Sequence, residues 1–432
     1  MQIIKDGDIR APTSPWRASI AAGLGTAIEY YDFQLYAVLA VTLSPLFFST
    51  QDPNTALLST LAIFAGAFVA RPLGGVFFGL FGDRYGRTAA LMLTVVGIGV
   101  ASALIGLLPT YAVIGVAAPM LLLFLRLMQG FFAGGEITGA ATYIAECSPP
   151  DRRGFFGAFN PAAATLGLTA ATAVAGLTGV IFGSEATQEW AWRIPFLLSI
   201  PLIALCLWAR FRIEDSPKFR QIMLEHKVVK APLKTLFTEH RRAVLQVISI
   251  GFAQNAAGYV SIIYLNIHLT RTLGYDPVAV FWLISITTFI ASLFMPFVGG
   301  LSDRFGRKPL LTIGFAGYIV LTPITFYAAS LGSFAMCAAA VVLGILPFII
   351  VQAVGYPLYA ELFPTRVRYS GVSLGFNIAT ILGGGTAPYI AAWLTAASGH
   401  HLAPSAYVVV AAIIGLTTLV GLRETADRPL EN

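Results

Sequence analysis

The sequence GLFGDRYGR, at residues 79–87, has a near copy in GGLSDRFGRK, at residues 299–308. Both stretches follow a long apolar segment, and their shared acidic residues, Asp83 and Asp303, lie 220 positions apart. This offset is close to half of the 432-residue chain. The recurrence therefore predicts two related halves that lie in the same orientation.

A second pair of stretches repeats at nearly the same offset. Residues 143–154 read YIAECSPPDRRG and residues 359–371 read YAELFPTRVRYSG, which places Glu146 and Glu361 215 positions apart. Two stretches that recur at similar offsets favour the duplication of a whole half over the duplication of a single loop.

The composition is that of a polytopic membrane protein. Apolar residues make up 57% of the chain and charged residues 11%, and the mean hydropathy is +0.77. Soluble domains carry about 25% charged residues, so this composition excludes a soluble, fibrous or disordered chain. Its three cysteines (Cys147, Cys206 and Cys337) lie in or beside apolar runs, where we expect small buried side chains rather than a disulfide framework.

The apolar segments predict an all-α protein with twelve transmembrane helices, because crossing a bilayer takes about 20 apolar residues. The predicted spans are 18–48, 56–80, 89–109, 112–146, 155–182, 193–211, 242–270, 278–300, 310–330, 335–360, 371–397 and 405–422.

The basic residues predict the orientation of these spans. Tails and loops on one side carry 23 of the 27 Lys and Arg residues, while Arg193 and Arg271 lie on the other side and Arg71 and Arg126 within spans. Because positive charge marks cytoplasmic loops, both termini are predicted to be cytoplasmic in an inner-membrane protein. The long polar stretch 212–241 is predicted to be a cytoplasmic linker. It divides the chain into residues 1–211, a tail and six-helix bundle, and residues 242–432, a six-helix bundle and tail.

The repeated D-R-x-G-R stretches, at these loop positions, resemble the major facilitator superfamily over essentially the whole chain. Other stretches are similar to its metabolite:proton symporter family: AIEYYDFQLYA (27–37), FVARPLGG (68–75), RLMQGFFAGGEITGAATYIAE (126–146) and GGGTAP (383–388). The resemblance implies the major facilitator fold and the proton-coupled import of small carboxylates or of zwitterions such as proline and betaine.

Two departures from that family bear on the substrate. Tyr30 stands where the family more often has Trp, which keeps an aromatic wall. The chain ends ten residues after the last predicted span, at Asn432, without the long C-terminal coiled coil of the osmosensing members. The resemblance therefore favours a metabolite over an osmolyte.

The repeated loop motifs predict a cytoplasmic gate. Asp83 can accept hydrogen bonds from helix N-termini or from Arg, and the motif's glycines permit close helix approach. Glu146 and Glu361 can pair with loop arginines, Arg368 included; alternatively, these arginines only set the topology. The predicted gate comprises Asp83, Arg84, Arg87, Glu146, Arg152, Arg153, Asp303, Arg304, Arg307, Glu361 and Arg366.

Five charged residues lie within the predicted spans, all in the first half: Glu29, Asp32, Arg71, Arg126 and Glu136. A charge in hydrocarbon costs at least ~2.5–3.5 kcal/mol, so such residues are candidates for function. Glu29 and Asp32 share a helix face, and two close carboxylates do not both ionise readily. We expect Asp32 to carry the coupling proton with Glu29 as its modulator. Glu136 is the rival carrier, and a static ion pair with Arg71 or Arg126 is the structural alternative.

Arginine offers paired donors that match a carboxylate, so Arg126 and Arg71 are predicted to anchor the substrate. A permanent salt bridge to the carboxylates of the first helix is the alternative. Polar residues predicted to line the substrate site, or else to join helices by hydrogen bonds, are Gln129, Tyr31, Asn160, Asn255, Tyr259, Gln352 and Asn377.

The leading hypothesis is a proton-coupled symporter that imports a small organic acid, such as a di- or tricarboxylate or an oxoacid, by alternating access. The alternatives are a proton-driven exporter of drugs or metabolites and a symporter of a zwitterion such as proline or betaine. No motif indicates an enzyme, a nucleic-acid partner, a metal or a cofactor other than the coupling proton. We expect a monomer in the lipid bilayer that binds a small, anionic molecule.

Overall fold

The computed structural model describes residues 14–49, 52–85, 87–134, 136–210, 236, 238–364 and 367–426. Within these ranges it leaves out the side chains of residues 21, 79–80, 82–91, 136–138 and 208–210. Most of the predicted linker, 212–241, lies outside the described residues, so the domain boundaries stay a prediction.

Every regular element in the described residues is helical. The first half contains α1 (Pro15–Val38), α2 (Ala40–Phe47), α3 (Pro53–Tyr85), α4 (Arg87–Leu107), α5 (Tyr111–Ile114), α6 (Ala117–Ala133), α7 (Glu136–Cys147), η1 (Pro150–Arg152), α8 (Arg153–Gly157), α9 (Phe159–Ala186), η2 (Thr187–Ala191), α10 (Arg193–Leu197) and α11 (Ser199–Arg210).

The second half follows with similar elements. They are α14 (Arg241–Tyr259), η3 (Val260–Tyr264), α15 (Leu265–Ile267), η4 (His268–Thr272), α16 (Pro277–Phe305), α17 (Arg307–Ser330), α18 (Phe334–Gly344), α19 (Leu346–Glu361), α20 (Arg368–Ala379), η5 (Thr380–Gly385), α21 (Ala387–Ser398) and α22 (Ala403–Val420).

Seven helical segments in the described residues are long and apolar enough to cross a membrane. They are Pro53–Phe78, Pro150–Ala191, Arg241–Thr272, Pro277–Phe305, Arg307–Ser330, Phe334–Glu361 and Ala403–Val420. Shorter apolar helices occupy three more predicted spans: Met92–Leu107, Ala117–Ala133 and Arg193–Leu207. The two predicted spans that remain, 18–48 and 371–397, correspond to the more polar helix pairs α1–α2 and α20–α21. The predicted span 112–146 is divided among α5, α6 and α7, and Gly115, with φ +57°, separates α5 from α6.

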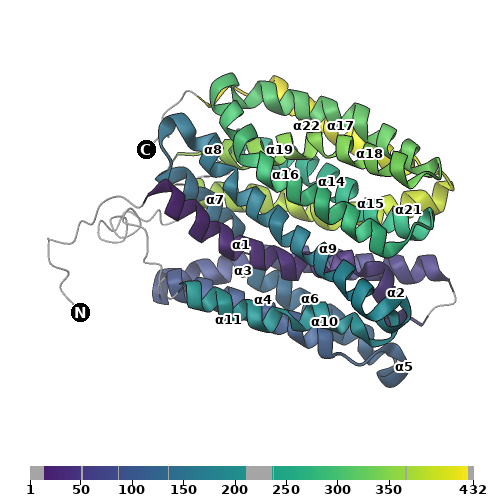
Figure 1. Cartoon of the computed structure of the whole chain (residues 1–432). Coiled ribbons are helices and arrows are strands. Elements are labelled where there is room, and N and C mark those ends of the chain that lie inside the picture. The colour runs from purple at the N-terminus through teal and green to yellow at the C-terminus, as the bar shows by residue number, and fades with distance from the viewer. Residues whose placement is uncertain are drawn as a thin grey trace.

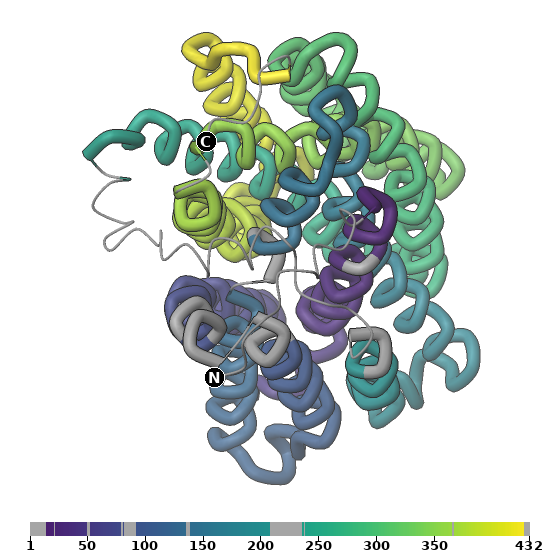
Figure 2. Tube along the Cα trace, turned by 90° about the vertical axis from the view of Figure 1, so that its left-hand side faces the viewer, coloured from purple at the N-terminus to yellow at the C-terminus, as the bar shows by residue number. Residues whose placement is uncertain are grey.

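The two halves lie side by side. Figure 1 shows the green and yellow helices of the second half packed along the purple and blue helices of the first, and Figure 2 views them from the end. Near the middle, α9 meets α16 through the hydroxyls of Thr169 and Thr288, 2.8 Å apart. The ring of Phe68 on α3 meets that of Tyr259 on α14, with centroids 5.8 Å apart.

The start of α1 and the second D-R-x-G-R motif lie at the same end of the molecule. Trp16 packs edge-on against Phe155 and Phe156, and the backbone N–H of the adjoining Gly154 donates to Asp303. This is the end that the basic residues predict to be cytoplasmic. At the other end, the Asn266 amide donates to the Val38 carbonyl across the halves, at 3.4 Å.

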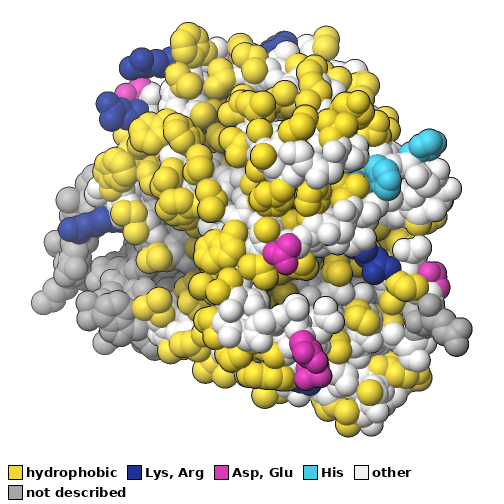
Figure 3. Space-filling model, turned by 45° about the vertical axis from the view of Figure 1, so that its right-hand side comes forward, with side chains coloured by type: hydrophobic (Ala, Val, Ile, Leu, Met, Phe, Trp, Pro, Cys, Tyr) yellow, Lys and Arg dark blue, Asp and Glu magenta, His cyan; other side chains and the backbone are white. Residues whose placement is uncertain are grey.

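Large apolar side chains cover the outside of the bundle, as Figure 3 shows for one face. Leu73, Phe297 and Val420 are 68%, 65% and 79% exposed on α3, α16 and α22. Such a surface is costly in water and is stable against lipid tails. The outer faces of these helices therefore match a bilayer.

Helices α3 and α6 approach until backbone touches backbone. A Cβ atom added at Gly130 would clash with the carbonyl oxygen of Ala67, and one added at Gly134 would clash with that of Arg71. These glycines form a small-xxx-small pattern, which lets membrane helices gain packing energy at short distance. The contact fixes α3, and with it Arg71, against the helix that carries Arg126.

We expect Gly130→Ala to lower the apparent Tm of the purified protein by several degrees, because its added methyl has no room and overpacking costs about 1–3 kcal/mol. Gly66→Ala on α3 is the matched control, since its methyl meets only Leu123 at 3.5 Å. Tryptophan fluorescence during thermal melting in detergent measures both variants. Equal melting of the two variants would contradict the close contact.

Candidate functional site

The two carboxylates of α1 turn to different helices. The Glu29 side chain is fully buried, and its Oε1 accepts from Arg71 Nη2 on α3 at 3.3 Å. Asp32, also buried, accepts a short hydrogen bond from the Ser199 hydroxyl on α11 and another from Ser102 on α4. Glu29 and Asp32, which were predicted to share a helix face, therefore have different partners. Glu29 forms an ion pair, and Asp32 accepts hydrogen bonds from two hydroxyls.

Arg126 is enclosed by aromatic rings rather than by carboxylates. Its guanidinium carbon lies 4.6 Å from the Phe33 ring centre and 4.5 Å from that of Tyr36. Its Nη1 donates to the Phe33 carbonyl at 3.2 Å, whereas Nε and Nη2 have no acceptor among the described residues. Arg71 touches the same Phe33 ring at 4.3 Å. Cation–π contacts of this kind stabilise a desolvated guanidinium by about 2 kcal/mol.

A chain of hydrogen bonds joins Arg126 to Asp32. Arg126 Nη1 donates to Gln129 Oε1 at 2.7 Å, and Gln129 Nε2 donates to Ser102 Oγ at 2.6 Å. Ser102 in turn hydrogen-bonds to Asp32. Two polar side chains, Gln129 and Ser102, therefore connect the Asp32 carboxyl to the Arg126 guanidinium.

Ser102 and Ser199 were not predicted from the sequence. A serine in an apolar helix usually bonds to its own backbone, so its residue type alone does not mark it as a partner of a buried carboxyl.

A cavity of about 50 Å³ lies between the halves, with room for a few water molecules. Its wall of fourteen residues contains no charged side chain. Gln34 Nε2 donates across it to the Tyr259 hydroxyl at 2.9 Å. Its main polar and aromatic residues are Tyr30, Gln34, Asn255, Tyr259, Phe348, Gln352 and Tyr356.

The predicted lining residues divide between this wall and helix contacts. Asn255, Tyr259 and Gln352 line the cavity. Tyr31 and Asn160 instead join helices: the Tyr31 hydroxyl donates to the Pro195 carbonyl at 2.7 Å, and Asn160 accepts from Thr26 at 3.1 Å. The remaining predicted residues, Gln129, Arg71, Arg126 and Asn377, lie outside the wall.

Charged contacts between the halves lie at the cytoplasmic end. Asp303 accepts from the backbone N–H groups of Gly154 and Phe155, at 2.7 and 2.9 Å. Glu146 on α7 pairs with Arg368 on α20 at 3.3 Å. Asn377 of the second half also donates to the Gly134 carbonyl of the first, at 3.4 Å. These contacts join the two halves at the cytoplasmic end.

The second half stabilises Asp303 with a buried network. Arg307 pairs with Asp303 and with Glu361, each at 2.9 Å. Glu424 accepts from the backbone N–H groups of Arg307 and Lys308 at the start of α17. Burial alone would raise the pKa of Glu424, but four backbone donors hold this pKa below its ordinary value. The sequence did not predict this contribution of the C-terminal segment, because Glu424 lies outside the two repeated stretches from which the gate was predicted.

The other predicted gate residues have different surroundings or are not described. Arg304 is exposed, Arg152 lies in solvent 3.9 Å from Asp151, and Arg153 is buried. Several candidates lie outside the described residues, namely the side chains of Asp83, Arg84, Arg87 and Glu136 and the whole of Arg366.

Comparison with known proteins gives one consistent result. The family model for sugar (and other) transporters matches residues 18–231 and again 218–432. A proline/betaine transporter of Salmonella typhimurium is 36% identical over 99% of this chain and 86% of its own length. The inner membrane metabolite transport protein YhjE of Escherichia coli is 37% identical, over 95% of this chain and 94% of its own. The shikimate transporter of the same organism is 32% identical, over 95% and 94%.

Solved structures agree on the fold. The proton:xylose symporter XylE, bound to a bromodeoxyglucose, superposes with a TM-score of 0.77 over 97% of this chain and 98% of its own, at 18% identity. A partially occluded inward-open form of XylE from Escherichia coli gives a TM-score of 0.75 over 97% and 100% of the two chains, also at 18% identity.

Asp303→Asn is expected to open the cytoplasmic side more often, because it removes the charge that holds two N–H groups of the other half. Hydrogen bonds to a charged group are worth about 1.5–3 kcal/mol, or at least about tenfold in an equilibrium. The measurement is the labelling rate of Ala164→Cys, on the cavity wall, by an impermeant maleimide in inside-out vesicles, with the native cysteines replaced by Ser.

Asp276→Asn is the matched control, since Asp276 accepts the Ala279 N–H at the outer end of the same helix. We expect labelling to be about tenfold faster in Asp303→Asn and unchanged in Asp276→Asn. Equal rates in both variants would rule out Asp303 as a gate residue.

Proposed function

Because the chain belongs to the sugar (and other) transporter family of the major facilitator superfamily, and is a multi-pass inner-membrane transporter rather than an enzyme, we propose that it imports a small zwitterionic solute together with protons. Proline and betaine are the leading candidates. Relatives named for these solutes match 99% of the chain at 36% identity. The observation that carries the proposal is the uncharged, tyrosine-rich wall of the cavity between the halves.

That wall fits a zwitterion better than a di- or tricarboxylate. Desolvating two or three negative charges is costly unless cations replace the water, and the wall carries none. Tyr30, Tyr259 and Tyr356 instead offer aromatic faces, which attract a quaternary or secondary ammonium. The amides of Gln34, Asn255 and Gln352 offer donors to a single carboxylate.

The proposal therefore replaces the organic acid expected from the sequence with the zwitterionic alternative. The proline/betaine relatives match 99% of this chain over 86% of their own length, so the likeness to them covers both halves. One relative, at 32% identity, is named for shikimate, which is a monocarboxylate. Shikimate is therefore included among the solutes to be tested.

Proton coupling is proposed to run through Asp32. An ionised Asp32 accepts hydrogen bonds from Ser102 and Ser199, whereas a protonated carboxyl has a proton to donate. If Asp32 donates to Ser102, the serine must redirect its own proton, and the Gln129 amide that contacts it must adjust. The adjustment reaches Arg126, because Gln129 accepts from its guanidinium.

The Arg126 guanidinium reaches the cavity wall through two ring contacts. Arg126 lies 5.3 Å from the Phe64 ring centre, and Phe64 packs on Tyr259, with centroids 6.0 Å apart. Tyr259 belongs to the second half and lines the cavity. Protonation of Asp32 thus has a continuous path of contacts to the residues that meet the solute.

The first test is a solute panel in proteoliposomes with an acidic exterior. Radiolabelled betaine or proline is expected to accumulate about tenfold or more and to leak out when a protonophore is added, because a 100 mV gradient supplies ~2.3 kcal/mol per charge. Succinate, citrate and shikimate are run beside them. Accumulation of a di- or tricarboxylate without betaine or proline would refute the proposal.

A matched set of tyrosine variants tests the aromatic wall. Tyr259→Leu should raise KM for the accumulated ammonium solute about tenfold, since a desolvated cation–π contact contributes up to about 2 kcal/mol. Tyr259→Phe keeps the ring and should change KM by no more than about threefold. Tyr327→Leu, on an exposed side chain, should leave KM unchanged.

Asp32→Asn is expected to abolish uphill uptake and to spare counterflow, because the amide cannot exchange a proton yet still accepts hydrogen bonds. Uptake of labelled solute is measured with and without a pH gradient, and counterflow is measured in vesicles preloaded with the same solute. Asp52→Asn, at an exposed carboxylate, is the control. Retained uphill uptake in Asp32→Asn would show that another group carries the proton.

A further inference from the structure

A second cavity, of about 300 Å³, opens at the surface between α14 and α22, near their cytoplasmic ends. It is separate from the cavity between the halves, with which it shares no residue. Its size lies at the lower end of the ~300–1,000 Å³ of small-molecule sites. We call it the α14–α22 groove; its wall consists of Arg241, Arg242, Leu245, Gln246, Ser249, Thr417, Thr418 and Gly421.

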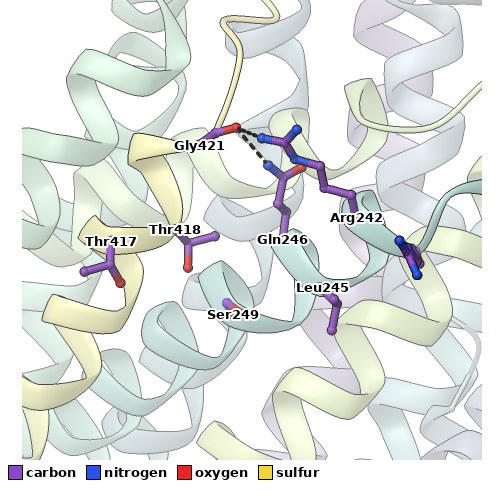
Figure 4. A pocket seen from close by; sticks show the side chains of 8 residues that line it. Arg242, Leu245, Gln246, Ser249, Thr417, Thr418 and Gly421 are labelled. Atoms are coloured by element: carbon purple, nitrogen blue, oxygen red, sulfur yellow. Dashed lines mark hydrogen bonds between the residues drawn. The ribbon is translucent and has the colours of Figure 1, made fainter.

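The cytoplasmic end of the groove is rich in hydrogen-bond donors. Arg242 Nη2 donates to the Gly421 carbonyl at 2.7 Å, and Gln246 Nε2 approaches the same oxygen at 3.4 Å, as Figure 4 shows. The second guanidinium, that of Arg241, makes no hydrogen bond or ion pair with any described residue. The guanidinium groups of Arg241 and Arg242 belong to the same wall and have unused N–H donors, and with no carboxylate in that wall they match a phosphate.

Hydroxyls with free acceptor sites lie farther along the groove, where Figure 4 labels Thr417, Thr418 and Ser249. Thr417 and Thr418 both donate to the Ile414 carbonyl, at 2.9 and 2.8 Å. Their protons are therefore committed, while their oxygens can still accept. They can accept a hydrogen bond from a ligand on the membrane side of the two arginines.

The surroundings of the groove are apolar. Leu245 is 60% exposed on its wall, and Val420, on the same helix as Thr417, is 79% exposed. Both helices are long and apolar enough to cross a membrane, so these side chains face lipid tails. Cations at the headgroup level above an apolar surface match a molecule that is anionic at one end and hydrocarbon at the other.

We propose that the α14–α22 groove binds one anionic glycerophospholipid of the cytoplasmic leaflet. Its phosphodiester contacts Arg241 and Arg242, and an acyl chain lies along Leu245 on the membrane side of these cations. The bound lipid bridges the first and last helices of the second half. A soluble phosphate ester has the same phosphate chemistry as the lipid but no acyl chains. The test therefore compares a lipid with a soluble phosphate ester.

Native mass spectrometry of the full-length protein in detergent tests the site with three probes: dioleoylphosphatidylglycerol, dioleoylphosphatidylcholine and glycerol 1-phosphate. One phosphatidylglycerol should remain bound at a concentration at which phosphatidylcholine is retained about tenfold less, because only the former has net negative charge for the guanidinium pair. Excess glycerol 1-phosphate should not displace it.

The double variant Arg241→Gln/Arg242→Gln should lower the phosphatidylglycerol occupancy about tenfold, since it removes both charges at exposed positions. Arg423→Gln is the matched control, because it removes the same charge at an exposed site that is not in the wall. Thr418→Trp, which fills the groove without changing charge, should also lower the occupancy.

Three results would each overturn the proposal. One is equal retention of phosphatidylglycerol by the wild type and the double variant. Another is equal retention of the two lipids by the wild type. The third is displacement of phosphatidylglycerol by glycerol 1-phosphate, which would show a site for soluble phosphate esters.

Discussion

Glu29 and Arg71 form an ion pair within the first half of the molecule. The separation of the two halves depends on that location. Separating charges in hydrocarbon costs several kcal/mol, so two bundles that part and rejoin in each cycle must not share such a pair within the membrane. At mid-height the described contacts between the halves are uncharged, and they include the hydroxyls of Thr169 and Thr288 and the packed rings of Phe68 and Tyr259. These contacts can be broken and remade at low cost.

The two ends of the interface are held differently. At the cytoplasmic end the charges of Asp303, Glu146 and Arg368 join the halves, whereas at the outer end an amide of Asn266 meets a backbone carbonyl. Bonds to charged groups are the stronger ones. In this structure the cytoplasmic end of the interface is therefore held by the stronger contacts.

Much of the fold could be predicted from the sequence, because hydrocarbon imposes a length and a composition on each span. Intramembrane charges were just as visible, since Glu29, Asp32 and Arg126 stand out in apolar surroundings. Their partners were not visible. Phe33, which contacts two guanidinium groups, is one Phe among 31 and has nothing in its local sequence to mark it. The division of predicted lining residues into wall and helix contacts depends on helix rotation, which periodicity alone does not determine.

Among the described residues, Asp303 contacts the other half through main-chain N–H groups. Amino-acid substitutions in α8 therefore leave these two hydrogen bonds to Asp303 intact, with one exception. A Cβ atom at Gly154 would collide with the carbonyl of Gly299, so the halves fit only while that position lacks a side chain. A substitution at Phe155 keeps the main-chain donor and changes only the ring packing, whereas the Gly154 position and the Asp303 carboxylate depend on each other.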